Sequence, residues 1–162
     1  MQLNDAPDFE ISDQVATEDE RHDVVFTVND EEGPVSEFAY GFSVNNENLF
    51  NLGASRFVTA NGSTTVTLNL VPSLNANGTA SITVTVTDNA STPVQVVANT
   101  FTITVTAVND APTFNIDQTK IVVTEDARAQ IIDNFLTNID AVESGQSITS
   151  VNVAVQTGAE LF

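Results

Sequence analysis

One short segment occurs twice in this chain, and the duplication limits the folds that the chain can adopt. Asn-Asp-Ala-Pro stands at residues 4–7 and again at residues 109–112. The blocks that follow the two copies match in the same order: Phe9-Glu10-Ile11 with Phe114-Asn115-Ile116, and Thr17-Glu18-Asp19 with Thr124-Glu125-Asp126. A tetrapeptide alone carries little information, whereas three matched blocks in one order indicate an internal repeat. We therefore expect Asn-Asp-Ala-Pro to be a joint where one domain ends and the next begins.

The segments between turn-rich stretches alternate apolar and polar residues, which is typical of β-strands. They are rich in Thr, Val, Ile and Phe, whereas Asn, Asp, Gly, Pro and Ser fill the gaps. The strands predicted in this way are 9–11 with 14–17 (a split first strand), 22–28, 37–44, 49–50, 57–58, 64–70, 80–88 and 99–108. About seven antiparallel strands in roughly 100 residues predict an all-β, Greek-key β-sandwich. This complete repeat is expected to span residues 1–108.

The second copy of the repeat, residues 109–162, is incomplete. It is predicted to contain a first strand at 114–123, a second at 129–136, an acidic loop at 138–146 and a third strand at 148–155. Glu160-Leu161-Phe162 then matches Asn48-Leu49-Phe50, and the two long final strands have no counterpart in the sequence. Half a sandwich exposes an apolar face and unpaired strand edges. We therefore expect a segment of a longer repeat protein, or a tail that a strand from a partner chain completes.

Charge is the outlier of the composition, with 22 acidic residues against four basic ones and a formal net charge of −18. Nucleic acid and anionic membrane surfaces repel such a chain, and no apolar run approaches the length of a membrane span. We therefore expect no nucleic-acid partner and no direct membrane insertion. Carboxylate oxygens suit hard cations such as calcium. The alternative is that the acidity only keeps the surface soluble, as in proteins adapted to salt.

Catalytic chemistry has little support in the sequence. The chain has no cysteine, so it offers no disulfide framework, zinc site or thiol nucleophile. His22 is the single histidine and stands among charged residues, which is typical of a surface residue rather than a catalytic base. Rows of threonine at 83–87 and 102–106 could form a flat ice- or glycan-binding face, but threonine is also favoured on the solvent face of strands. We predict that the protein is not an enzyme.

Three stretches carry a family resemblance: 107–114 (Ala-Val-Asn-Asp-Ala-Pro-Thr-Phe), 75–80 (Asn-Ala-Asn-Gly-Thr-Ala) and 84–89 (Val-Thr-Val-Thr-Asp-Asn). They resemble the cadherin-like tandem repeats of large bacterial surface proteins, and the loop at 143–146 is also similar to a loop of such repeats. The resemblance covers the whole chain, although the linker here is shorter than the fuller cadherin pattern. It implies a cadherin- or immunoglobulin-like sandwich that acts as a spacer or adhesive module outside the cell, with calcium (Ca2+) at the joints.

Successive loops of a sandwich alternate between its two ends, so acidic residues from several loops are expected to meet at a joint. The residues predicted for a calcium site at the joint are Glu18, Asp19, Asn109, Asp110, Asp140 and Glu143. Those predicted for a partial site, at the end where the chain enters the first repeat, are Asn4, Asp5, Asp30, Glu31, Glu32 and Asp88. Such oxygen-rich sets suit calcium and are poor for transition metals. The alternative is a stiff linker without metal, in which Asp110 caps a turn and Pro112 fixes the backbone.

These observations predict a structural module of an extracellular bacterial surface or secreted protein, in which tandem sandwiches extend or build a fibre. Its partners would be neighbouring repeats of the same protein or identical subunits. One alternative is a subunit of a self-assembling filament or surface layer that uses strand complementation. Another is a ligand- or glycan-binding module appended to a larger secreted protein, although Tyr40 and the ten phenylalanines mostly fall on alternating core positions.

Overall fold

The computed structural model describes residues 4–31, 38–60, 63–88, 94–117, 121–122, 124, 128–143 and 145–154. By its internal contacts the chain divides into two units, Met1–Val108 and Asn109–Phe162. Each unit is described by itself below. No helix in the described ranges is long and apolar enough to cross a membrane.

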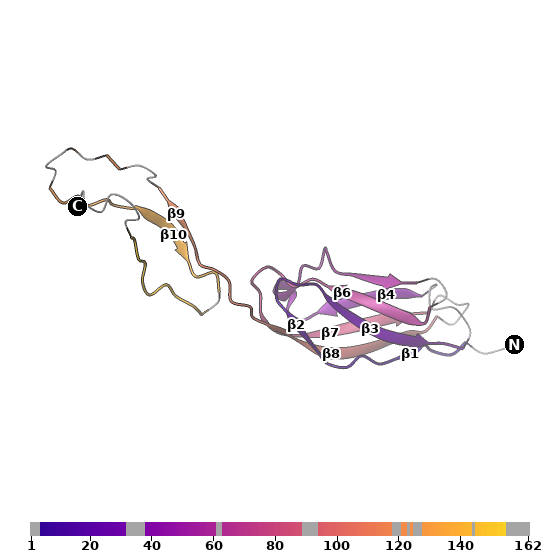
Figure 1. Ribbon diagram of the computed structural model, residues 1–162. Helices are drawn as coiled ribbons and strands as arrows, with labels where there is room; N and C mark the ends of the chain where they lie inside the picture. Colours follow the sequence, from indigo (N-terminus) through magenta and orange to yellow (C-terminus); the bar gives the residue numbers. More distant parts are fainter. Residues whose placement is uncertain are drawn as a thin grey trace. The chain divides into compact units, whose positions relative to one another are not determined.

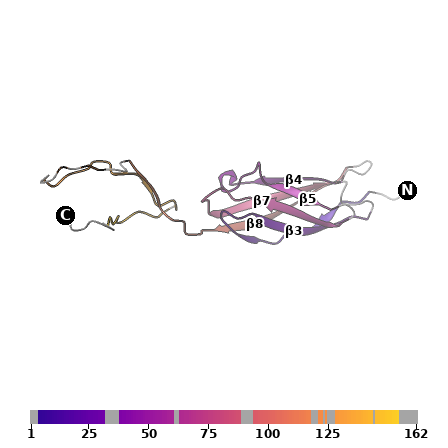
Figure 2. The same ribbon diagram turned by 45° about the horizontal axis from the view of Figure 1, so that its top comes forward.

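The first unit consists of two four-stranded sheets packed face to face (Figures 1 and 2). The first sheet has the order β1 (Asp8–Phe9), β3 (His22–Asn29), β6 (Thr65–Leu70) and β5 (Arg56–Thr59). The second sheet has the order β2 (Gln14–Thr17), β8 (Val96–Thr106), β7 (Gly78–Thr87) and β4 (Ala39–Val44). All neighbouring strands are antiparallel except β2 and β8, which run parallel. The predicted all-β sandwich is confirmed.

The first strand of the sandwich changes sheets partway along its length, as the split in its sequence pattern predicts. Its first part, β1, pairs with β3, so that Phe9 stands opposite Val28. Its second part, β2, pairs in parallel with β8, so that Thr17 stands opposite Thr106. This switch, together with the strand order of the two sheets, makes the first unit an immunoglobulin-like sandwich.

The core of the first unit comes from the alternation that is visible in the sequence. The inward side chains of β7 are Ile82, Val84 and Val86, and all three are fully buried. They face the inward side chains of β3 and β6, which are equally buried. The threonines between them lie on the solvent side, as strand geometry requires. Removal of this apolar surface from water is the main term that holds the two sheets together.

The structure corrects one element of the first unit. Residues 49–50 are not a strand, because Glu47–Leu49 forms a single 3-10 turn and Phe50 makes only an isolated bridge to Pro72. Leu49 and Phe50 are consecutive in sequence and both buried. A strand sends consecutive side chains to opposite faces, so a coiled backbone is needed to point both of them into one core.

In the described part of the second unit there is one antiparallel strand pair, β9 (Thr113–Ile116) with β10 (Leu136–Asp140). Its register places Thr113 opposite Asp140, just as Asp8 stands opposite Asn29 in the first unit. The pair β9–β10 is therefore the counterpart of β1–β3, and a one-step register irregularity lies within it.

Several predicted elements of the second unit are wrong. The second strand, β10, begins at Leu136, which is the last residue of the predicted segment 129–136. The predicted loop at 138–146 begins inside β10. Residues 148–154 form no strand, while Val155 and Glu160–Phe162 lie outside the described residues. The physical reason is visible in the first unit, where β4 has hydrogen bonds only to β7. No described strand of the second unit stands in the place of β7, so the counterpart of β4 has no partner to form a ladder.

The assignment of the core can be tested at a pair of leucines. Leu68 is fully buried on β6, whereas Leu74 is exposed in a loop. Leu68→Ala should lower the free energy of unfolding of the first unit by about 2–5 kcal/mol, because lost burial and the new cavity add together. Leu74→Ala should change it by less than about 0.5 kcal/mol. Urea denaturation followed by circular dichroism measures both, and equal losses would contradict the assignment.

Candidate functional site

Among the described residues, three carboxylates are buried, although the chain carries a large excess of negative charge. Glu18 and Asp88 are each 1% exposed and Glu143 is 7% exposed. Burial of a carboxylate is costly unless hydrogen bonds replace its water. All three belong to the residues predicted to bind calcium, and each lies in a turn or loop outside the strands. The loops at the ends of the units are therefore the places where carboxylate oxygens are held in fixed positions.

Glu18 follows β2 directly and connects three segments of the first unit. Its Oε1 accepts a hydrogen bond of 2.6 Å from the backbone N–H of Val108, and its Oε2 accepts one of 3.4 Å from Nδ2 of Asn77. Its own backbone N–H donates to the carbonyl of Thr106 at 3.0 Å. Glu18 thus extends the parallel ladder between β2 and β8. Its side chain fixes the backbone at the point where the polypeptide leaves the sandwich.

The neighbouring Asp19 is bound to the same loop. It adopts a left-handed backbone conformation (φ 63°), and its Oδ1 accepts a hydrogen bond of 2.9 Å from the backbone N–H of Asn75. Asn75 is also left-handed (φ 55°), a conformation that asparagine and aspartate tolerate best among residues other than glycine. The turn at 75–78 therefore lies at the same end of the first unit as Glu18 and Asp19.

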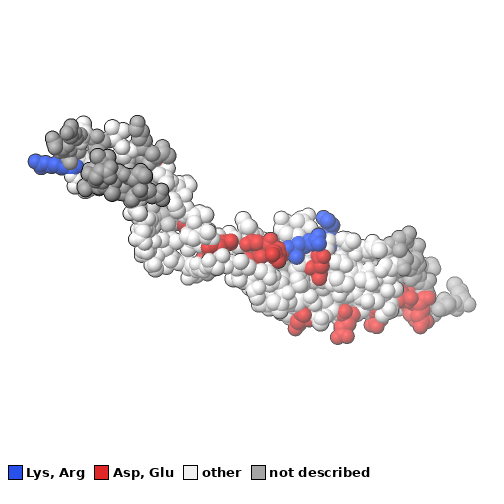
Figure 3. Space-filling model, viewed as in Figure 1, with Lys and Arg blue, Asp and Glu red and all other residues white. Residues whose placement is uncertain are grey.

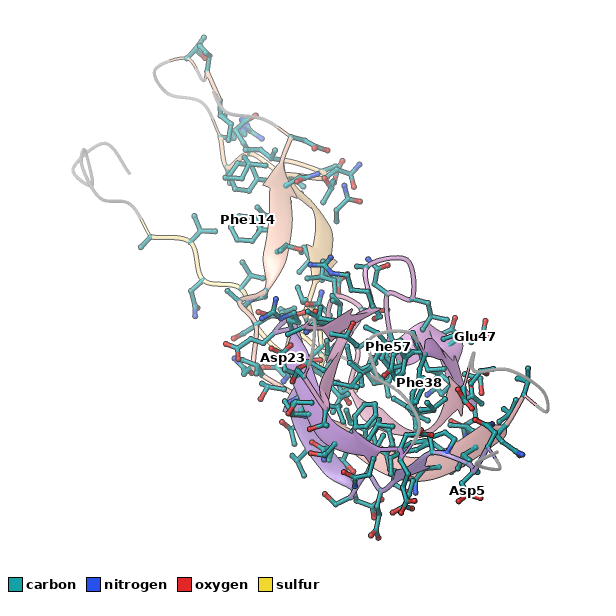
Figure 4. The ribbon with its side chains drawn as sticks, turned by 90° about the vertical axis from the view of Figure 1, so that its right-hand side faces the viewer. Asp5, Asp23, Phe38, Glu47, Phe57 and Phe114 are labelled. Atoms are coloured by element: carbon teal, nitrogen blue, oxygen red, sulfur yellow. The ribbon has the colours of Figure 1, made fainter. Side chains whose placement is uncertain are left out.

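At the opposite end of the first unit, Asn4 and Asp88 are in contact. Nδ2 of Asn4 donates a hydrogen bond of 2.7 Å to Oδ2 of Asp88, which lies just after β7. Asp30 is half-buried directly after β3, whereas Asp5 and Glu31 are exposed, and Asp5 projects from the sandwich in Figure 4. Glu32 lies outside the described residues. The first Asn-Asp-Ala-Pro copy is thereby joined to the end of β7.

In the second unit, the other Asn-Asp-Ala-Pro copy is held by the loop that follows β10. Glu143 Oε1 accepts a hydrogen bond of 3.2 Å from the backbone N–H of Asp110. Nε2 of Gln146 donates one of 3.1 Å to Oδ1 of Asn109. Asp140 Oδ1 accepts one of 2.9 Å from the N–H of Val142, whose φ of 72° is rare for a β-branched residue. The loop after β10 therefore contains a strained residue, Val142, and it also binds the joint residues Asn109 and Asp110.

The donor set favours a hard cation. It consists of carboxylate and amide oxygens only, which suit calcium rather than a transition metal. Within the residues that the structure describes, no three acidic or histidine side chains gather closely enough to hold a metal ion. The predicted joint site draws its oxygens from both units, and the predicted site at the other end includes Glu32. Both calcium sites therefore stay predictions.

The charge of the surface is consistent with binding of cations from solution. Figure 3 shows acidic side chains along the edge of the first unit and few basic side chains beside them. Arg21 pairs with Asp23 through a contact of 2.9 Å between Nε and Oδ1, and both side chains are exposed. With four basic residues against 22 acidic ones, most carboxylates cannot have a basic partner from the chain itself. Their counterions must come from solution.

Sequence reasoning missed the groups that donate hydrogen bonds to the buried carboxylates. The backbone N–H groups of Val108 and Asp110 leave no trace in the side-chain pattern. Asn77 and Gln146 stand among many other polar residues, and nothing in their spacing distinguishes them. The available signal was the position of Glu18 and Asp88, each directly after a strand, where backbone donors are left over.

The immunoglobulin-like class of the first unit is assigned from its strand order alone. The comparisons with known proteins do not narrow this class further. No protein-family model and no curated protein matches the sequence. Among solved structures, the chain is similar to the M1 domain from titin, with a TM-score of 0.38 and 12% identity. That alignment covers 64% of this chain and 95% of the titin domain. A likeness at this level shows neither a shared family nor a shared function.

Removal of the Glu18 carboxylate should destabilise the first unit. Glu18→Ala leaves the N–H of Val108 and the amide of Asn77 without their acceptor, and hydrogen bonds to charged groups are among the stronger ones. We expect a loss of about 1–3 kcal/mol in the free energy of unfolding, measured in urea. The control is Glu20→Ala, which removes the same charge from an exposed position of the same turn and should cost less than about 0.5 kcal/mol. Similar losses for both would show that charge, rather than the hydrogen bonds, is responsible.

Proposed function

We propose that the protein is a structural, non-enzymatic repeat module of an extracellular bacterial surface or secreted protein of the adhesin type. The observation that carries the proposal is the recurrence of one motif in both units. Asn-Asp-Ala-Pro precedes an antiparallel strand pair in each case, and the outermost residues pair in the same way, Asp8 opposite Asn29 and Thr113 opposite Asp140. Repetition of a unit together with its joint is what a spacer requires, because length is gained by adding copies.

The mechanism proposed for such a spacer is stiffening of the joint. The first unit holds the N–H of Val108 through Glu18, and the second holds the N–H of Asp110 through Glu143. Asn109 alone separates the two fixed N–H groups, and its side chain accepts a hydrogen bond from Gln146. Pro112 restricts the backbone further. These contacts restrict the backbone on either side of Asn109, and they are the proposed source of stiffness in a joint without metal.

Calcium at the joint is part of this proposal. The residues that would hold it are the six predicted above, of which Glu18, Asp19 and Asp110 supply carboxylates on either side of the linker. When bound, the cation would neutralise neighbouring carboxylates that otherwise repel each other. The residues of the chain supply the positions of the oxygens, since the buried Glu18 and Glu143 are already oriented by backbone N–H groups.

The absence of catalysis also belongs to the proposal. His22, the single histidine, has its Nε2 at 3.1 Å from Oε1 of Gln14, an amide that cannot act as a nucleophile. Tyr40 and Phe42 of β4 are packed against Phe57, with ring centroids 5.5 and 5.8 Å from that of Phe57. These contacts favour a structural role over a ligand-binding one.

The runner-up is a subunit of a self-assembling filament or surface layer. Its support is the exposure of apolar side chains in the second unit, including Phe114 on β9 and Ile139 on β10. Exposed apolar faces of this kind are typical of surfaces that meet another polypeptide.

Calcium should stabilise the protein if the joint binds it. The melting temperature of the full chain should rise by several degrees on addition of millimolar calcium and fall back with a chelator, because ligands that bind only the folded state stabilise it. Asp110→Ala should abolish this response. The matched control is Asp133→Ala, which removes one charge from an exposed loop of the same unit and should keep the response. An unchanged melting temperature of the wild-type chain would leave the stiff linker without metal as the explanation of the joint.

Assembly state separates the two structural roles. A spacer module should sediment as a monomer at micromolar concentration, because its net charge of −18 makes copies repel each other. A filament subunit should form ordered polymers under the same conditions. Analytical ultracentrifugation and negative-stain electron microscopy distinguish these outcomes, and polymers would rule out the simple spacer.

A further inference from the structure

We propose that β4, at the edge of the second sheet, pairs in antiparallel orientation with β4 of a second copy of this chain. The two molecules then form one closed pair, related by a two-fold axis. The inference goes beyond the proposed function, because it concerns how two modules associate side by side. It uses only the first unit, and neither calcium nor the second unit enters it.

The strand β4 is the least protected edge of the sandwich. The edge strands are β1 and β5 in the first sheet and β2 and β4 in the second. A charged residue stands in β1 (Asp8) and in β5 (Arg56), and β2 has only four residues. In contrast, β4 has six residues, Ala-Tyr-Gly-Phe-Ser-Val, without a charge, a proline or a break in its register. Edge strands usually carry one of these devices to prevent pairing with another chain.

The hydrogen bonds of β4 reach β7 on one side only. The N–H of Asn45, which continues the register of β4, donates to the carbonyl of Ser81 at 3.2 Å. Bonded and non-bonded residue pairs alternate along an antiparallel ladder. Ser43 therefore bonds to β7, whereas the N–H and C=O groups of Phe42 and Val44 point away from it. In the described part of the chain, no hydrogen bond from another segment reaches these outward groups.

The open edge belongs to a closed sandwich. The apolar faces of the two sheets already cover each other, so the edge of β4 is not a gap in the core. After β4, the 3-10 turn at Glu47–Leu49 leads the chain away to β5 in the other sheet. Figure 2 shows β4 along the border of the sandwich. The outward groups of β4 are therefore accessible to a strand from another molecule.

Apolar side chains gather beside this edge without being fully enclosed. Tyr40 and Phe42 of β4 lie 5.5 and 5.8 Å from Phe57 of β5 between ring centroids. Leu52, from the loop that connects these strands, belongs to the same half-buried group at the margin of the core. A strand added to β4 would cover more of these side chains, and burial of aromatic surface contributes strongly at interfaces.

The sequence of β4 fits the edge of another β4. Antiparallel pairing with Phe42 opposite Phe42 of the second copy uses the outward backbone groups of both strands. Tyr40 then stands opposite Val44, and these apolar side chains meet on the inner side. The outer side carries small, uncharged residues: Ala39, Gly41 and Ser43. A second copy therefore supplies a strand of the right length and alternation, and no like charges from the strands themselves meet.

Each pair should be weak. A single strand pair buries less than the roughly 800 Å² per partner that is typical of a stable interface. The net charge of −18 also makes two copies repel each other, and salt screens this repulsion. Pairing is therefore expected well above micromolar concentration and should become tighter as salt is added. Many copies held close together would pair more readily, because each contact raises the effective concentration for the next one.

The first experiment measures pairing of the full chain in buffer without calcium, from micromolar to millimolar protein. Sedimentation equilibrium should show a reversible dimer without larger species, about tenfold tighter in molar than in low salt. Hydrogen exchange followed by NMR should show that the amides of Phe42 and Val44 gain protection as the dimer forms. The amide of Ser43 should not change, because it is already bonded to β7.

A second experiment tests the register through introduced cysteines, since the chain has none of its own. Phe42→Cys places two thiols on the axis, where opposite Cα atoms are about 5.5 Å apart, a distance that a disulfide spans. Ser43→Cys is more exposed, but its two copies are diagonal neighbours about 7–8 Å apart, too far for an unstrained disulfide. With oxidised glutathione, Phe42→Cys should form the linked dimer much faster than Ser43→Cys.

A third experiment separates the backbone from the side chain. Phe42→Ala and Phe42→Pro both remove the aromatic ring, but only proline removes the N–H that points away from β7. Phe42→Pro should therefore dimerise about tenfold more weakly than Phe42→Ala. Circular dichroism verifies that both variants keep the sandwich, since neither change removes a hydrogen bond to β7.

Four results would overturn the inference: no dimer at millimolar concentration, no gain in protection at Phe42 and Val44, equally fast cross-linking at both cysteine positions, or weaker pairing in high salt. Larger ordered polymers would also contradict a closed pair. The calcium response and the monomer at micromolar concentration test the proposed function. Neither depends on β4, so the two ideas fail separately.

Discussion

The two sheets of the first unit depend on each other, and the rest of the structure follows from this dependence. Each sheet has one face of valine, isoleucine, leucine and phenylalanine that is stable only when the other sheet covers it. The second unit shows the same requirement through side chains that no described sheet covers. Its strand pair matches β1–β3 at the outermost pair, Thr113 opposite Asp140, yet Phe114 and Ile139 stay exposed because no described sheet lies over them. Register is a local property, whereas burial needs the whole sandwich.

The buried carboxylates give the ends of the units a chemistry of their own. Glu18 and Glu143 each accept a backbone N–H from the segment that joins the two repeats, and Asp88 accepts an amide N–H from Asn4 of the first joint motif. In all three cases the acidic side chain accepts a hydrogen bond from a neutral donor. Such donors replace the water around a buried carboxylate without removing its charge.

Strand positions in the first unit were predictable because burial there alternates with the period of the backbone. Ile82, Val84 and Val86 show that period directly, and the predicted strand matches the observed one. Leu49 and Phe50 break the period, because the 3-10 turn at Glu47–Leu49 lets both side chains enter the core. In the second unit, residues 148–154 have a strand-like sequence without a strand, because hydrogen-bonding partners are a property of the surroundings. The acidic positions of the candidate site were equally visible, but their backbone donors were not.

The parallel pairing of β2 with β8 has a consequence for load. The chain enters the first unit through β1 and β2 and leaves it through β8, so tension on the two ends pulls β2 and β8 in opposite directions. Their ladder, from Gln14 opposite Ile103 to Thr17 opposite Thr106, then bears the force in shear, with all of its hydrogen bonds loaded at once. A hairpin pulled from its open end would instead unzip bond by bond. At the end of that ladder, Glu18 accepts a hydrogen bond from the N–H of Val108, and this bond is loaded in shear together with the others.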